Sequence, residues 1–301
     1  MEDNKIFTNR ELNLLSRGYS KEDILKVKNY SYDDISKIFN LIVERITKDC
    51  KKSKNPKCVI IGGQPGCGKT TYSMIYNAEQ ENKFVEIGID NYRMYHPNYL
   101  EIEDIIREHW KDRKETENDT PGNDIADFTH SFAGMMTDLI TNKLSKTENG
   151  IGYNILLEWS MRTPEEPLKL MKDFNKKGYK IDVVFLGVNK DVSLAACKLR
   201  ANVMKNGKHI IRKVPNDFHE LCIKTLPDSC NIIYTNGYVL GDYISDMKII
   251  SRNGNILWSP KNNCLPGIVL SECINNNQYE DVNHENIAYE IYENEASGLV
   301  K

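Results

Sequence analysis

The chain has 301 residues, of which 40% are hydrophobic and 28% charged, and its 40 Lys and Arg against 43 Asp and Glu give a net charge of −3. This is ordinary globular composition, which excludes wholesale disorder and allows one large α/β domain or two small ones. Proteins that bind nucleic acid through bulk charge are normally basic, so nucleic acid is not an expected partner. No stretch approaches the roughly 18 apolar residues of a membrane span, and the N-terminus lacks a signal-peptide layout, so we expect a cytoplasmic protein with no membrane partner.

The first fifty residues predict three helices. Each begins with a hydroxyl residue that has a carboxylate three positions later, an arrangement that satisfies free N–H groups at a helix start. These pairs are Thr8 and Glu11, Ser20 and Asp23, and Ser31 and Asp34. The third helix also has apolar residues at the 3, 4 spacing of one helix face, at Ile35, Ile38, Phe39, Ile42, Val43 and Ile46. The region is either a packing extension or a surface that binds a partner.

After a short basic connector at 51–56, apolar runs alternate with helical segments. We expect strands at 58–61, 83–87, 154–157 and 181–186, and a shorter one at 232–234. Helices are expected near 138–144, 164–177 and 193–205. This alternation predicts a parallel sheet with helices on both faces.

The C-terminal part predicts a β-hairpin followed by a polar tail. Asn253-Gly254 separates two strand-like runs at 248–252 and 255–258, which indicates a two-residue turn in which both positions have φ > 0. The last thirty residues are rich in Asn and Glu and predict one acidic helix at 283–294. The eight cysteines include no C-x-x-C pair, so we expect buried thiols and no structural metal.

A phosphate-binding loop is the sharpest motif in the chain. Residues 63–70 fit the pattern G-x-x-x-x-G-K-[ST] at every fixed position, between a predicted strand and a predicted helix. In such a loop, backbone N–H groups surround a phosphate at the positive end of the helix dipole. Lys69 is expected to reach the β- and γ-phosphates, and Thr70 to bind Mg²⁺. The predicted ATP-binding residues are Gly63, Gln64, Pro65, Gly66, Cys67, Gly68, Lys69, Thr70 and Thr71.

Two further groups of polar residues lie at predicted strand ends. Asp90 follows the run at 83–87, at the edge where parallel sheets bind substrates, and is either a base toward an acceptor hydroxyl or a turn former. Glu158, Ser160 and Arg162 follow the run at 154–157. They form either a cluster that binds a polyol or phosphate group, or the cap of the next helix.

Two arginines suit phosphoryl transfer, which needs cations on the migrating phosphate. Arg200 and Arg212 lie on and after the helix at 193–205, as lid residues over the γ-phosphate or as surface groups. Asn189-Lys190-Asp191 lacks the spacer of the guanine-reading N-K-x-D, and no strand ends in the Asp that motor ATPases use for magnesium. These features favour a small-molecule kinase.

Four blocks in the order of the chain together resemble the zeta toxins of bacterial toxin–antitoxin systems. These are P-loop kinases that phosphorylate the 3′-hydroxyl of UDP-N-acetylglucosamine and so starve cell-wall synthesis. The resemblance runs from about residue 57 to about residue 258. The blocks are 62–70, 89–99 with its ending His-Pro-Asn-Tyr, 157–163, and Arg200 with 211–215.

The resemblance implies a role for each matching position. Asp90 matches the residue that acts as the base toward the sugar hydroxyl. Lys69 and Thr70 match the residues that bind phosphate and magnesium. Arg200 and Arg212 match the two arginines that stabilise the transferring phosphoryl group. Sugar-nucleotide binding is implied for Asp138, Glu158, Ser160 and Arg162. ATP with Mg²⁺ and a small helical antitoxin that covers the nucleotide site are implied as well. Three positions depart from the family pattern, all in the acceptor pocket: Trp159 replaces Gly, Ser160 replaces Thr and Asp138 replaces Glu.

The sequence therefore predicts an α/β, P-loop kinase-like parallel sheet with helices on both faces. We divide the chain into a helical N-terminal extension (1–55), a kinase core (56–260) that includes the hairpin, and a C-terminal tail (261–301). The favoured activity is ATP-dependent phosphorylation of a UDP-amino sugar by a growth-arresting toxin. The alternatives are a P-loop kinase of another acceptor (a nucleotide, an antibiotic or a dinucleotide cofactor) and a non-catalytic, ATP-gated binding protein.

Overall fold

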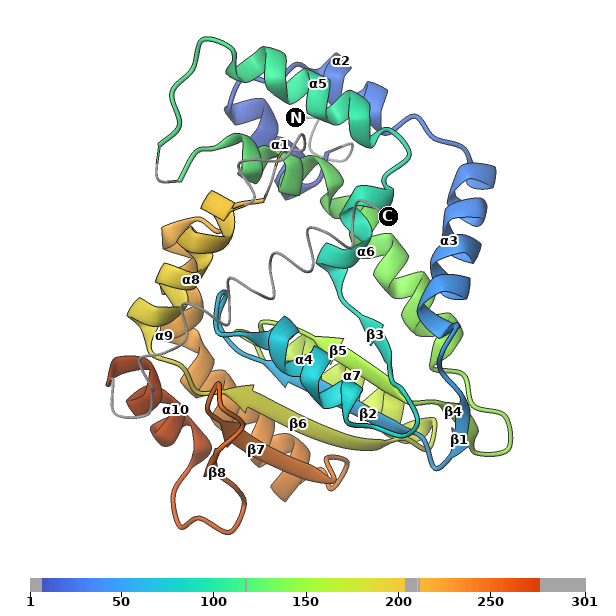
Figure 1. The fold of residues 1–301 in the computed structure, drawn as a ribbon, viewed down its shortest axis with the longest axis vertical. Helices are drawn as coiled ribbons and strands as arrows, with labels where there is room; N and C mark the ends of the chain where they lie inside the picture. The colour runs from blue at the N-terminus through green and yellow to red at the C-terminus, as the bar shows by residue number, and fades with distance from the viewer. Residues whose placement is uncertain (1–6, 117, 204–209, 211, 277–301) are drawn as a thin grey trace. The chain divides into compact units, whose positions relative to one another are not determined.

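The computed structural model describes residues 7–116, 118–203, 210 and 212–276, drawn in Figure 1. The chain divides into two compact units, which are described separately below. Unit 1 takes Met1–Lys48, Gly88–Lys143 and Met204–Pro215, and unit 2 takes Asp49–Ile87, Leu144–Val203 and Asn216–Lys301. The boundaries predicted at 55/56 and 260/261 remain sequence-based, and the predicted helix at 283–294 lies outside the described residues.

Unit 2 contains the predicted sheet, with six strands in the order β3-β5-β2-β6-β7-β8. The bounds are β2 (Lys57–Gly62), β3 (Val85–Ile87), β5 (Ile155–Glu158), β6 (Lys180–Leu186), β7 (Asp246–Ile250) and β8 (Ile256–Trp258). The first five strands run parallel to their neighbours, and β8 runs antiparallel to β7. The expected basic connector instead contains β1 (Lys52–Lys54), which pairs with β4 (Ile151–Tyr153). The parallel α/β fold is confirmed.

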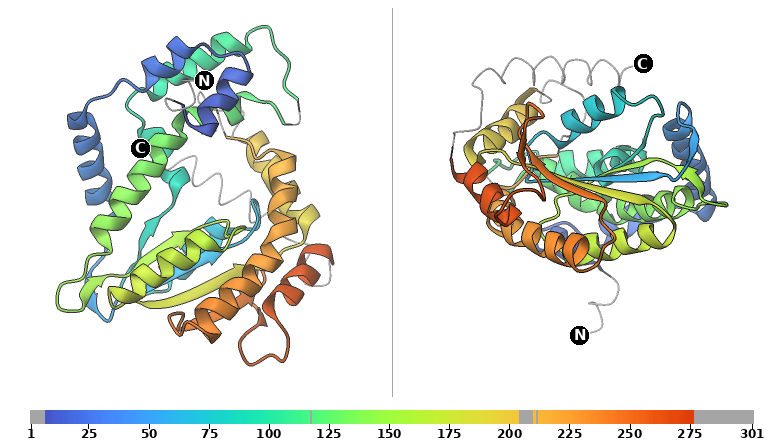
Figure 2. Two further views of the ribbon diagram at one scale, coloured as in Figure 1. Left: turned by 180° about the vertical axis from the view of Figure 1, so that it is seen from behind. Right: turned by 90° about the horizontal axis from the view of Figure 1, so that it is seen from below.

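Helices cover both faces of this sheet, as expected for strands that are apolar throughout. On one face, Val59, Ile61 and Leu156 form a buried cluster with Tyr72 and Tyr76 of α4 (Lys69–Ala78) packed against it. Alternate strand residues point to the opposite face, which α7 (Glu165–Lys176) and α9 (Asn216–Ile233) cover. The right-hand view of Figure 2 shows α4 on one side of the sheet and α7 and α9 on the other. Two further helices of this unit are α8 (Lys190–Val203) and α10 (Pro266–Asn275).

The strand predicted at 232–234 is wrong. Helix α9 runs through Ile233 and continues as a π-helical segment, η4 (Tyr234–Val239). Buried residues recur along α9 at helical spacing, at Cys222, Leu226, Cys230 and Ile233. This helical stripe outweighs the β-branched run Ile232-Ile233.

The predicted hairpin forms, but its turn differs from the prediction. The loop between β7 and β8 is closed by Ser251 N–H donating to Asn255 O at 2.9 Å and Gly254 N–H donating to Ser251 O at 3.0 Å. Within this described loop, Gly254 has a positive φ of +81° and Asn253 does not. The hairpin is therefore longer than a two-residue turn, because the ladder ends at Ile250 and Ile256.

Unit 1 is helical and confirms the predicted N-terminal caps. Its elements are α1 (Asn9–Ser16), α2 (Lys21–Val27), α3 (Tyr32–Thr47), the 3₁₀ helix η2 (Ile89–Tyr95), α5 (Tyr99–Trp110) and α6 (Pro121–Leu144), whose last residue falls in unit 2. Thr8 and Ser31 form capping boxes with Glu11 and Asp34, and Ser20 accepts from the Asp23 N–H. A core from α1, α2, α5 and α6 includes Leu14, Ile24, Ile102, Ile106 and Phe128.

Helix α3 buries less than its predicted apolar face. Ile42 is its one buried residue, while the other residues predicted for that face are half-buried. Helix α6 is much longer than the segment predicted at 138–144. Among the described residues, no helix combines the length and apolarity needed to cross a membrane.

Candidate functional site

The predicted phosphate-binding loop joins β2 to α4 in unit 2. Gly68 is the N-cap of α4 with φ +98°, in the left-handed region that favours glycine. Gly66 has φ +76°, and a Cβ there would lie 2.0 Å from the carbonyl oxygen of Ser193, so the first turn of α8 packs directly against the loop. A tight turn between a buried strand and a helix N-terminus is the arrangement that presents backbone N–H groups to a phosphate.

Lys69 closes over its own loop. Its Nζ donates to the carbonyl oxygens of Gly63 at 2.8 Å and Gln64 at 3.0 Å, and lies 3.8 Å from Sγ of the buried Cys67. An anion bound in the loop would compete with these carbonyls for the ammonium group. The described loop therefore has the charge and the backbone geometry of a nucleotide-phosphate site.

Glu158, at the end of β5, lies against the start of α4. Thr70 Oγ1 donates to Glu158 Oε2 at 2.9 Å, and Ser73 Oγ donates to Glu158 Oε1 at 2.6 Å. The structure thus brings the predicted magnesium residue, Thr70, together with a predicted acceptor residue. A hydroxyl and a carboxylate side by side at the phosphate loop are oxygen donors of the kind that Mg²⁺ prefers.

The residues that follow Glu158 form a shaped loop. Met161 is buried with φ +50°, and its carbonyl oxygen accepts from Ser229 Oγ at 2.6 Å. Arg162 lies over the ring of Phe218, with Cζ 5.7 Å from the centroid. The N-cap of α7 is Pro164, which makes no side-chain cap hydrogen bond, so Ser160 and Arg162 do not cap that helix. Ser160 is half-buried in the same loop.

Asp90 and Arg212 come together within unit 1. Asp90 lies in η2 with half of its side chain exposed, and Arg212 forms an ion pair with its Oδ2. Arg93 Nε donates to the other carboxylate oxygen, Oδ1, at 2.7 Å. Asp138 is exposed on α6 in the same unit. Arg200 belongs to unit 2, where it is half-buried on α8.

Apart from Gln64, the residues of a buried polar network behind the phosphate loop escaped the sequence analysis. Gln64 Nε2 donates to Val188 O at 2.7 Å, and Ser193 Oγ lies 2.9 Å from His219 Nε2. Burial lowers the pKa of His219, which favours the neutral ring. Ser193 and His219 lie on different helices, α8 and α9, and neither belongs to a motif, so the sequence carried no signal for their contact.

Arg252 is a second residue that the sequence analysis missed. From the β7–β8 loop, its NH2 donates to Gly66 O at 2.5 Å and its Nε to Cys67 O at 3.3 Å. The carboxyl ends of parallel strands share one edge of a sheet, so a residue just after β7 can reach the loop after β2. The position of Arg252 directly after a strand was therefore the signal in the sequence that could have identified it.

We expect Arg252→Ala to raise the KM for ATP about tenfold or more while leaving the KM of the acceptor unchanged. Hydrogen bonds from a charged group are worth about 1.5–3 kcal/mol, and losing them would loosen the phosphate loop. Arg252→Lys should recover part of the loss. Steady-state kinetics with each substrate varied would test this, and an unchanged KM for ATP would contradict it.

The sheet, the phosphate loop and the helix after it define an α/β nucleotide-binding protein with a P-loop. The family model for Zeta toxin matches residues 42–263, and the chain belongs to the zeta toxin family. Members of this family are kinases that use ATP. The chain is 29% identical to Toxin PezT of Streptococcus pneumoniae over 189 residues. The matched region covers 61% of this chain and 66% of PezT, just under two thirds of its length.

Two further relatives also come from the zeta toxin family. The chain is 25% identical to Toxin zeta of Streptococcus agalactiae over 72% of this chain and 68% of that protein, and 24% identical over the same shares to Toxin zeta of Enterococcus hirae. A solved chain from the PezAT chromosomal toxin–antitoxin system of Streptococcus pneumoniae superposes with a TM-score of 0.66 at 22% identity. That match covers 91% of this chain and 99% of the solved one, which supports the fold.

Proposed function

We propose that the protein transfers the γ-phosphoryl group of ATP to the 3′-hydroxyl of UDP-N-acetylglucosamine or a related UDP-amino sugar. As a toxin, it would arrest growth by blocking cell-wall precursor synthesis. One observation supports the proposal: this chain belongs to the zeta toxin family and has a complete P-loop in unit 2, and in unit 1 the carboxylate of Asp90 is bound by Arg93 and Arg212.

In the proposed reaction, Asp90 accepts the proton of the sugar hydroxyl as its oxygen attacks the γ-phosphorus. The bond from the γ-phosphorus to the β,γ-bridging oxygen breaks, and ADP leaves with the electron pair. Lys69, Arg200 and Arg212 would stabilise the charge that spreads over the transferring group. The remaining residues of the phosphate loop, through Thr71, would hold the nucleotide.

Thr70 at the start of α4 and Glu158 at the end of β5 suit a magnesium ion bound with ATP. Thr70 and Glu158 would hold it through their oxygens, and the contact between them supports this assignment. When bound, Mg²⁺ neutralises charge on the β- and γ-phosphates. This proposal moves Glu158 from the predicted acceptor-binding residues to the metal, while Asp138, Ser160 and Arg162 would bind the acceptor.

We expect Arg162→Ala to raise the KM of the sugar nucleotide and leave the KM for ATP unchanged. A forked donor that binds the acceptor acts in the ground state as well as in the transition state. Lysine at this position should rescue poorly, because a point charge cannot reproduce the planar fork. If Arg162→Ala instead binds ATP more weakly, this loop is not the acceptor pocket.

The deciding experiment is incubation of the purified chain with ATP, Mg²⁺ and a panel of sugar nucleotides, with mass spectrometry of the acceptors. Phosphate added to a UDP-amino sugar by the wild type and not by Lys69→Ala would support the proposal. Phosphate on a nucleotide, an antibiotic or a dinucleotide would support the other kinase class. ATP binding without turnover in any mixture would favour an ATP-gated binding protein.

A small helical antitoxin is the proposed protein partner. The match to a chain from a toxin–antitoxin system supports this proposal. An antitoxin that covers the nucleotide site would exclude ATP. Co-purified complex should therefore fail to bind a fluorescent ATP analogue that the free chain binds.

A further inference from the structure

We propose that Arg93 is a positioning residue for Asp90, and that the N-terminal helix α1 fixes the turn of α6 on which Arg93 is anchored. This inference rests on the proposed function, because it assigns the support of the proposed base. All of the residues involved lie in unit 1.

Arg93 is the buried partner of a half-exposed carboxylate. Its side chain is 10% exposed, whereas that of Asp90 is 50% exposed. Its Nε donates to Asp90 Oδ1 at 2.7 Å, and its NH1 donates to Ala126 O at 2.7 Å and Thr129 Oγ1 at 3.1 Å. The planar guanidinium therefore ties one oxygen of Asp90 to a fixed point on α6.

This tie decides which part of the carboxylate can move. With Oδ1 held by Arg93 and Oδ2 paired with Arg212, rotation of the Asp90 carboxyl group is restricted. A base must be held close to its productive geometry, because misplacement by about 1 Å can cost about 10²-fold in rate. Arg93 would supply that restraint through Asp90, by holding its Oδ1.

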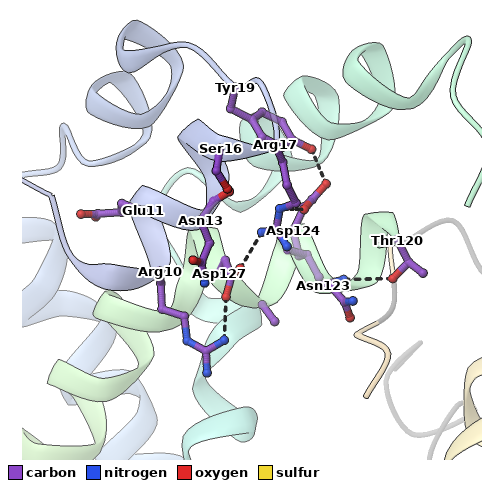
Figure 3. Close-up of polar contacts among 12 residues, drawn as sticks. Arg10, Glu11, Asn13, Ser16, Arg17, Tyr19, Thr120, Asn123, Asp124 and Asp127 are labelled. Atoms are coloured by element: carbon purple, nitrogen blue, oxygen red, sulfur yellow. Dashed lines mark hydrogen bonds and ion pairs between the residues drawn. The ribbon is translucent and has the colours of Figure 1, made fainter. Parts of the chain in front are cut away.

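The same turn of α6 is also held by residues in and just after α1 (Figure 3). Arg17 Nε lies 3.0 Å from Asp124 Oδ1, and its NH2 donates to Asp127 Oδ2 at 2.5 Å. Arg10 NH1 donates to Asp127 Oδ1 at 2.9 Å, and Tyr19 OH donates to Asp124 Oδ2 at 2.6 Å. Both aspartates are buried.

The carboxylates of these ion pairs are buried while the arginines are partly exposed, so breaking a pair would leave the aspartate charge out of water without its partner. Asp124 and Asp127 flank Ala126, the residue whose carbonyl oxygen binds Arg93. The contacts therefore form one chain from α1 through α6 and Arg93 to Asp90. The N-terminal helices have a function in this chain beyond covering the apolar core.

A double-mutant cycle tests the inference. Arg93→Lys keeps the charge and removes the fork, and it should lower kcat by about 10²-fold while the KM for ATP stays unchanged. Each kcat is divided by the concentration of ATP-binding sites, measured by titration with the nucleotide, so that unfolded protein does not lower the value. In an Asp90→Asn background, Arg93→Lys should cost little more, because the base that it positions is already gone.

The matched control is Arg45→Lys. Arg45 NH1 donates to the hydroxyl of Tyr95 at 2.9 Å, and Tyr95 lies in η2 as Asp90 does, so the variant changes an arginine contact to the same helix at another residue. This variant should keep the wild-type kcat. Thr129→Val, which removes one anchor of Arg93, should show a smaller loss than Arg93→Lys and covers the case in which Arg93→Lys does not fold.

The outcomes separate the inference from the proposed function. If Asp90→Asn alone turns over normally, the proposed base is wrong. If Asp90→Asn is impaired but Arg93→Lys costs the same in both backgrounds, Arg93 acts only through general stability and the inference is overturned. If Arg93→Lys lowers kcat only in the protein that retains Asp90, the inference is supported.

Discussion

Asp90→Asn is expected to lower kcat by about 10²–10⁴, the usual contribution of general base catalysis. Asparagine keeps the shape of the side chain and an oxygen that Arg93 can bind, but it cannot accept the proton of the sugar hydroxyl. ATP affinity should stay unchanged, because the proposed role is toward the acceptor. Measuring kcat with a saturating acceptor and ATP binding by titration would check both statements.

The control for this variant is Asp138→Asn, an exposed carboxylate of the same unit proposed to bind the acceptor. It should raise the KM of the acceptor more than it lowers kcat. Near-normal turnover in Asp90→Asn would return Asp90 to the role of a turn former in η2.

Arg212→Ala is expected to cut turnover by about 10³–10⁵ with every acceptor tested. Arginines that stabilise a migrating phosphoryl group contribute this much in related reactions, and they act mainly in the transition state. The variant would also remove an ion-pair partner of Asp90 Oδ2. The measurement is kcat at saturating ATP and acceptor, followed with the KM of each.

Arg200→Ala should lose turnover in the same way, while Arg162→Ala should change the KM of the acceptor. The pattern across the three variants is therefore more informative than any single loss. A defect of Arg212→Ala seen only in the KM for ATP would show that the residue binds nucleotide in the ground state and does not stabilise transfer.

Local signals predicted the fold where they were strong. The hydroxyl and carboxylate pairs at Thr8, Ser20 and Ser31 predicted three helix starts, because capping is a short-range interaction. The buried runs predicted β2, β3, β5 and β6, whereas β7, the fifth parallel strand, was expected only as one arm of the C-terminal hairpin. The segment at 232–234 failed because its β-branched residues belong to a longer helical stripe that ends at Ile233.

The candidate site was predictable only in part, for a related reason. A phosphate loop is contiguous, so its pattern is visible in the sequence. Arg252 and Gly66 meet across 186 positions, and Arg93 meets Thr129 across 36. Such contacts depend on strand order and helix packing, which single-residue patterns do not encode.

The close approach of Gly66 to Ser193 joins the first turn of α8 directly to the phosphate loop. Arg200 lies seven residues farther along the same helix, about 10 Å from that contact at 1.5 Å per residue. A tilt of roughly 10° about the contact would move the backbone at Arg200 by roughly 2 Å, given that rise per residue. A change in the loop on binding phosphate would therefore reach Arg200 through a single helix.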